Sequence, residues 1–170
     1  GGRADLGPLY NPEPVPALEI TPLLREPLCL VQPRPARSSK AGRRATAATV
    51  KLRELVDYPL VLPERTQSLR RLLQTQATLA GVTLDIACEV SSIPAIIDLV
   101  CARMGHAVLT ESAVAASGRA AELCTRRIVE PELPTVLCLA QSATKPPTPL
   151  IREARRVLSG LVARGKPQRR

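Results

Sequence analysis

The sequence has almost no aromatic residues. It contains no Phe and no Trp, and it has two Tyr, Tyr10 and Tyr58, among 170 residues. Because 45 % of the residues are nevertheless hydrophobic, the core must consist of Leu, Val, Ile and Ala. Aliphatic side chains of this kind suit helices packed on strands, so the composition favours an α/β fold of one ordinary domain or two small lobes.

Histidine is almost as scarce, which limits the chemistry. His106 is the single imidazole, so a Ser-His-Asp arrangement or a multi-histidine metal site has only this residue to use. The five cysteines are widely spaced, with no C-x-x-C pair, and the sequence has no glycine-rich phosphate loop. We therefore predict no enzyme, no cofactor and no bound metal. Cysteine usage of this kind favours a reducing cytoplasm.

Acidic residues are missing from two short basic runs, 34–44 and 164–170. These runs hold nine of the 24 Lys and Arg, and the other 15 are matched by 15 Asp and Glu, so the net charge of +9 comes from the runs alone. Runs of like charge are usually solvated, and we interpret 164–170 as a disordered basic tail. Contact of the runs with a nucleic acid remains the alternative, weakened by the lack of nearby aromatic stacking residues.

Long apolar stretches are also missing. None reaches the roughly 18 to 20 residues of a membrane span, and no signal peptide opens the chain. We therefore expect no membrane partner. The chain begins Gly-Gly without Met, and from this we expect that it was cut from a longer protein.

Periodicity in the middle of the chain alternates apolar strands with amphipathic helices. Short links join them, which is typical of an α/β layer with a parallel sheet. Pro8, Pro12, Pro14 and Pro16 predict a loop over 8–22. The predicted elements are strands at 23–31, 60–62, 84–90, 107–109, 128–129 and 135–140, a short helical turn at 52–58, and helices at 66–80, 91–104, 111–116 and 150–162.

Two helix starts suggest a ligand site. We expect Thr66 to cap the first central helix and Ser91 or Ser92 to cap the second. Because both helices follow strands of one sheet, their N-termini would meet at the carboxyl edge of the strands, where open α/β sheets bind ligands. The helix dipole and unpaired amides favour an anion there, and Arg65 adds charge. The alternative is that the three hydroxyl residues are merely caps and that Arg65 is solvated.

Four segments in order resemble the effector-binding domain of LysR-type transcriptional regulators. They are similar in particular to members of the nitrogen-assimilation-control and cyn-operon type. The resemblance covers roughly residues 5 to 163. The segments are LLREPLCLVQP, LRELVDYPLVLPERTQSLRRLL, AGVTLDIACEVSSIPAIIDLVCARMGHAVLTESAV and RRIVEPELPTVLCLA.

The resemblance implies a type 2 periplasmic-binding-protein-like fold, with two α/β lobes joined by two crossover strands. Residues 1–32 and 126–163 would form an incomplete first lobe with the crossovers, and 33–125 the second lobe. Family ligands lie between the lobes against strand-to-helix turns. The implied ligand-binding residues are Arg65, Thr66, Val90, Ser91, Ser92 and Ile93.

The implied function is regulatory and not enzymatic. The chain would sense a small, anionic metabolite for a transcription factor that binds DNA as a homodimer or homotetramer, through an N-terminal helix-turn-helix that is not in this chain. A stand-alone solute-binding protein of the same fold is the alternative, and an enzyme using Glu89 or Glu111 is another. Where the family often has Ala-Gly-x-Gly after the central helix, residues 102–105 read Ala-Arg-Met-Gly. This changes a turn near the cleft, so the effector cannot be taken from a relative.

Overall fold

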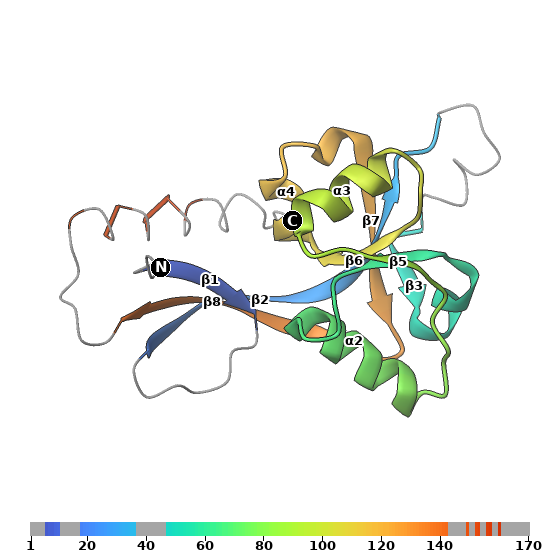
Figure 1. The fold of residues 1–170 in the computed structure, drawn as a ribbon, viewed down its shortest axis with the longest axis horizontal. Helices are drawn as coiled ribbons and strands as arrows, with labels where there is room; N and C mark the ends of the chain where they lie inside the picture. Colours follow the sequence, from blue (N-terminus) through green and yellow to red (C-terminus); the bar gives the residue numbers. More distant parts are fainter. Residues whose placement is uncertain are drawn as a thin grey trace. The chain divides into compact units, whose positions relative to one another are not determined.

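The computed structural model describes residues 6–10, 18–36 and 47–142, and six residues between 149 and 160 (Figure 1). The strands and helices follow one another along the chain as strands β1 and β2, then alternating strands and helices, then strands β7 and β8. Their bounds are β1 (Leu6–Tyr10), β2 (Leu18–Pro33), β3 (Thr49–Lys51), the 3-10 helix η1 (Leu52–Asp57), β4 (Leu60–Leu62), α2 (Ser68–Leu79), β5 (Ile86–Glu89), α3 (Ile93–Cys101), β6 (Ala107–Thr110), α4 (Glu111–Ala116), the 3-10 helix η2 (Ala120–Glu122), β7 (Leu123–Val129) and β8 (Pro134–Ser142).

Internal contacts divide the chain into two units, and the chain passes between them twice. Unit 1 comprises the residues up to Glu26 and those from Thr135, and unit 2 comprises Pro27–Pro134. The first passage lies within β2 and the second at the start of β8. The lobe boundaries predicted from the sequence, with 33–125 as the second lobe, stay a prediction.

In unit 1, β8 lies between β1 and β2. β1 runs antiparallel to β8, with Leu6 opposite Gln141 and Tyr10 opposite Leu137. The predicted loop over 8–22 is therefore wrong at both ends, because β1 includes Pro8 and β2 already starts at Leu18. β1 is the outermost strand of the sheet order. An outermost strand tolerates proline because one side of its backbone needs no ladder partner.

The predicted helix at 150–162 falls mostly outside the described residues. Those that are described within it or beside it are helical, namely 149, 152, 153, 156, 157 and 160, and Val157 is exposed. The other members of the predicted apolar face, Leu150, Ala154, Leu158, Leu161 and Val162, lie outside the described part, as do the basic tail 164–170 and most of the 34–44 run.

In unit 2, a mixed sheet is assembled around the second half of β2. β6 and β7 both pair antiparallel with β2, and β3 pairs parallel with β7. β4 and β5 form a parallel pair. Leu60 of β4 also forms an isolated parallel bridge with His106, the residue before β6, and the His106 amide donates to the Pro59 carbonyl at 2.8 Å. The predicted parallel pairing is confirmed for β4 and β5, whereas β6 pairs antiparallel with β2 in the larger sheet.

Helices cover the central strands of unit 2 on both sides. Figure 1 shows α3 and α4 on one side of these strands and α2 on the other. This explains why every residue of β4 and β6 is buried, unlike the alternating pattern of β5. α3 contributes its buried stripe Ile96, Ile97 and Val100, as the spacing predicts. In the described part of the chain, no helix is long and apolar enough to cross a membrane.

The end of α3 differs from the prediction. The helix stops at Cys101, and Met104, expected on the buried face, is 64 % exposed. Arg103, with φ 61°, takes the left-handed backbone conformation that favours glycine, at the position where the resemblance implies one. Gly105 serves another purpose, because a Cβ there would lie 2.8 Å from Val61 Cγ2 and 3.1 Å from the Pro59 carbonyl oxygen. It is needed for the close approach of this loop to β4.

Candidate ligand-binding site

Arg65 and Thr66 lie in an exposed turn between β4 and α2. The turn is closed by the Gln67 amide, which donates to the Glu64 carbonyl at 3.0 Å. The predicted cap at Thr66 is wrong, because this turn delays the helix to Ser68 and places Gln67 at the N-cap position. The Gln67 side chain accepts no hydrogen bond from the helix. The first amides of α2 therefore have no side-chain cap.

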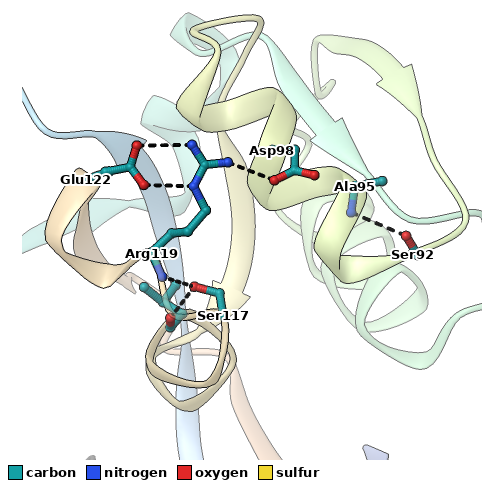
Figure 2. A network of polar contacts seen from close by, with 7 residues as sticks. Ser92, Ala95, Asp98, Ser117, Arg119 and Glu122 are labelled. Carbon is teal, nitrogen blue, oxygen red and sulfur yellow. Dashed lines mark hydrogen bonds and ion pairs between the residues drawn. The ribbon is translucent and has the colours of Figure 1, made fainter.

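Ser92 caps α3 as predicted. Its Oγ accepts a hydrogen bond from the Ala95 amide at 3.3 Å, which Figure 2 shows at the start of the helix. Pro94 has no amide hydrogen, so this first turn offers few donors to a ligand. The Val90 amide is also engaged, donating to the Leu62 carbonyl at 3.0 Å. Ser91 is exposed beside it.

The structure brings the two predicted turns to one edge of the sheet. β4 and β5 are neighbouring parallel strands, with Leu62 opposite Glu89. The hydrogen bond from Val90 to Leu62 links the residue after β5 to the last residue of β4. Arg65 and Thr66 follow one strand and Val90 to Ile93 follow the other. All six predicted ligand-binding residues thus belong to the carboxyl edge of the β4–β5 pair.

Arg70 is a residue of this edge that the sequence analysis missed. Its side chain is 1 % exposed, and Nη1 donates to the Pro63 carbonyl at 2.9 Å and to Glu89 Oε1 at 3.2 Å. A signal was present in the sequence, because Arg70 lies three residues before Leu73 and seven before Ala77, on the buried stripe of α2. Its Nε and Nη2 are buried and have no hydrogen-bond partner among the described residues.

A second polar cluster, around Arg119, ties α3 to the segment before β7 (Figure 2). Arg119 donates from Nε and Nη2 to the two carboxylate oxygens of Glu122, at 2.7 and 3.0 Å, and from Nη1 to Asp98 at 2.7 Å. The hydrogen bond from Arg119 lowers the pKa of Glu122. Because Nε, Nη1 and Nη2 are all engaged by carboxylates of the protein, the cluster holds structure together.

His106 lies away from the candidate site. It bridges to Leu60, the first residue of β4, whereas the site follows the last. Its Nδ1 is 3.3 Å from Gln32 Nε2, and the Tyr58 ring meets it edge-on, with 5.1 Å between centroids. These contacts favour a structural role. Within the described ranges, no group of three or more His, Cys, Asp or Glu is placed to hold a metal ion.

We expect His106 to make unfolding pH-dependent. Burial lowers its pKa below the ordinary value of 6.5. The unfolded chain therefore binds the proton first as the pH falls, so stability is full above about pH 6.5 and declines towards the folded-state pKa. Urea unfolding at pH 7.5 and 5.5 measures this decline. It should be smaller in His106→Gln than in the wild type, and an equal decline in both would assign the effect to other groups.

Comparison with known proteins gives one consistent match. The family model of the LysR substrate binding domain matches residues 1–162. The nitrogen assimilation regulatory protein nac of Klebsiella aerogenes is 29 % identical over 163 residues, which are 96 % of this chain and 50 % of that protein. The HTH-type transcriptional regulator BbuR of Bordetella bronchiseptica is 29 % identical over 95 % of this chain and 47 % of its own length. The chain thus spans about half the length of these curated regulators.

Solved structures agree on the fold. The regulatory domain of CcmR from Synechocystis PCC6803, in complex with 2-PG, has a TM-score of 0.67 at 20 % identity, covering 92 % of this chain and 73 % of that one. The effector binding domain of QuiR, in complex with shikimate, has a TM-score of 0.64 at 20 % identity, covering 91 % and 69 %. The architecture is that of LysR effector-binding domains, an α/β fold of the type 2 periplasmic-binding-protein-like class. With 162 of its 170 residues matched by the family model, the chain belongs to the LysR substrate-binding-domain family.

Proposed function

We propose that the chain is the effector-sensing domain of a LysR-family DNA-binding transcriptional regulator and that its effector is a small anionic metabolite. The observation that carries the proposal is the meeting of two strand-to-helix turns at the carboxyl edge of β4 and β5, linked by the bond from Val90 to Leu62. The proposed ligand-binding residues are Arg65, Thr66, Val90, Ser91, Ser92 and Ile93. The complexes of the CcmR regulatory domain with 2-PG and of the QuiR effector binding domain with shikimate support a small-molecule effector.

We further propose that the effector binds between two lobes and biases their orientation. A ligand shifts a conformational equilibrium only by its difference in affinity for the two states. The coupled readout is DNA binding by a helix-turn-helix outside this chain, in a cytoplasmic homodimer or homotetramer without a membrane partner.

Thermal unfolding of the chain against a panel of small organic acids tests the binding part. We expect a subset of acids to raise the unfolding temperature in a saturable way, because a ligand that binds only the folded state stabilises it. Arg65→Ala should weaken the apparent affinity a few-fold, the usual effect of an exposed charge. Arg53→Ala is the matched control, because Arg53 is an exposed arginine of η1 ahead of β4. It should leave the apparent affinity for the acid unchanged.

A promoter-reporter assay with the full-length regulator tests the regulatory part. The acid that stabilises the chain should change transcription, and Arg65→Ala should shift the response to higher concentrations. Binding of the acid with no change in DNA occupancy or transcription would favour the solute-binding alternative and overturn the regulatory proposal.

A further inference from the structure

We propose that Arg70 is the carboxylate-binding residue of this site and that it uses its Nε and Nη2 edge. The inference rests on the proposed function and names the ligand chemistry, a planar carboxylate held by two parallel hydrogen bonds. Nε and Nη2 are the buried side-chain nitrogens that lack a hydrogen-bond partner among the described residues. Both lie on one side of the guanidinium fork, the geometry that matches two carboxylate oxygens.

The remaining nitrogen of Arg70 fixes the fork in place. Nη1 donates to the Pro63 carbonyl at 2.9 Å, directly after β4, and to Glu89 Oε1 at 3.2 Å, at the end of β5. The guanidinium is thereby held at the carboxyl edge where Arg65 and Ser91 also lie. A fork that is already oriented loses little side-chain entropy when a ligand binds.

The same protein shows how this edge pairs with a carboxylate. In Arg119, Nε and Nη2 are the two nitrogens that hold the carboxylate of Glu122, at 2.7 and 3.0 Å, while Nη1 turns to Asp98 (Figure 2). Arg70 repeats half of this arrangement, with Nη1 engaged and the other two nitrogens vacant. A ligand carboxylate would complete it.

The start of α2 favours an anion more than the start of α3 does. α2 has 12 residues and no side-chain cap, so its dipole and first amides are uncompensated. α3 has Ser92 on the Ala95 amide and a proline that lacks a donor. Glu89 opposes the ligand's charge only weakly, because its side chain is 42 % exposed and screened by water.

Binding at this edge would be coupled to a structural change. Nε and Nη2 are closed off from solvent, so a carboxylate reaches them only when neighbouring groups move. Between β4 and α2, Pro63 is buried but residues 64 to 67 are all exposed, and displacement of 64 to 67 disturbs little packing. Buried unpaired donors raise the free energy of the unliganded state, and a carboxylate removes that cost. The equilibrium therefore responds to the ligand, as a sensor requires.

Arginine Nε–Hε resonances of the 15N-labelled 170-residue chain test the inference directly. Acetate, succinate, shikimate and inorganic phosphate serve as probes. We expect at least one carboxylate to shift the Arg70 resonance in a saturable way. Arg70→Gln and Arg70→Lys should both weaken the binding of that carboxylate about 10- to 100-fold. Lysine keeps the charge but cannot form the two parallel hydrogen bonds of a guanidinium. Arg71→Gln, the exposed neighbour on α2, should leave the affinity unchanged.

Several results would overturn the assignment. An Arg70 resonance that responds to none of the probes would contradict the assignment of Arg70 as the carboxylate-binding residue. A response to phosphate but to no carboxylate would contradict it as well. Wild-type affinity for the carboxylate in Arg70→Lys would show that two parallel hydrogen bonds from Nε and Nη2 are not used. The measurement on the wild-type chain does not depend on whether a variant folds.

The outcome also separates this inference from the proposed function. If the Arg70 resonance does not shift but the full-length Arg70→Lys regulator still changes transcription in response to its effector, the inference fails and the regulatory proposal stands. If Arg70 binds a carboxylate that never alters transcription, the assignment of Arg70 stands and the regulatory proposal fails.

Discussion

Ile97→Asp is expected to unfold unit 2. Ile97 is 1 % exposed and lies in the middle of the buried stripe of α3, beside Ile96 and Val100. The substitution removes a packed aliphatic side chain and places a carboxylate where no partner or water can satisfy it. The expected loss is about 4 kcal/mol or more, a large share of the roughly 5 to 15 kcal/mol that stabilises an ordinary domain.

Circular dichroism and urea unfolding measure this loss. Ala102→Asp is the matched control, because Ala102 is exposed at the end of the same helix. There the new charge meets only the helix dipole and should cost at most about 1 kcal/mol. A folded Ile97→Asp chain with the unfolding midpoint of the wild type would show that α3 does not pack against the sheet as described.

Gly105→Ala is expected to destabilise the chain by about 1 to 3 kcal/mol. The added Cβ would lie 2.8 Å from Val61 Cγ2 and 3.1 Å from the Pro59 carbonyl oxygen. Val61 cannot easily yield, because it is fully buried in β4 and its branched side chain has few rotamers. The cost arises from this contact.

A double-mutant cycle separates the two contacts of position 105. Val61→Ala alone creates a small cavity and destabilises the chain. In that background, Gly105→Ala should cost less than in the wild type, since only the Pro59 oxygen remains close. Equal costs in both backgrounds would show that the Val61 side chain is not the obstacle.

Local sequence patterns predicted the centre of unit 2 well. The apolar run of β4, the alternation around β5 and the stripe of α3 with its Ser92 cap are all determined by neighbouring residues. The strands of unit 1 were harder, because β1 pairs with β8 at the far end of the chain. No local pattern reveals such a partner, and the prolines of 8–22 argued against any strand.

The site could likewise be predicted only where local sequence patterns determine it, and not where contacts formed on folding do. The turns after β4 and β5 could be assigned from strand and helix order, and the structure places them at one edge. The N-cap of α2 could not be assigned from the sequence, because the hydrogen bond from the Gln67 amide to the Glu64 carbonyl decides where that helix begins. Arg70 is buried only because folding brings the Pro63 carbonyl and Glu89 to it. A charged residue within an apolar stripe was the sole clue.

The boundaries of unit 2 have a consequence for how such proteins can be rebuilt. The Leu28 amide donates to the Leu133 carbonyl at 2.9 Å, so the entry and exit of Pro27–Pro134 lie side by side. A segment whose ends meet can be transplanted into a host loop without stretching the host. Pro27–Pro134 is therefore a segment that recombination could exchange as one piece between the genes of related regulators.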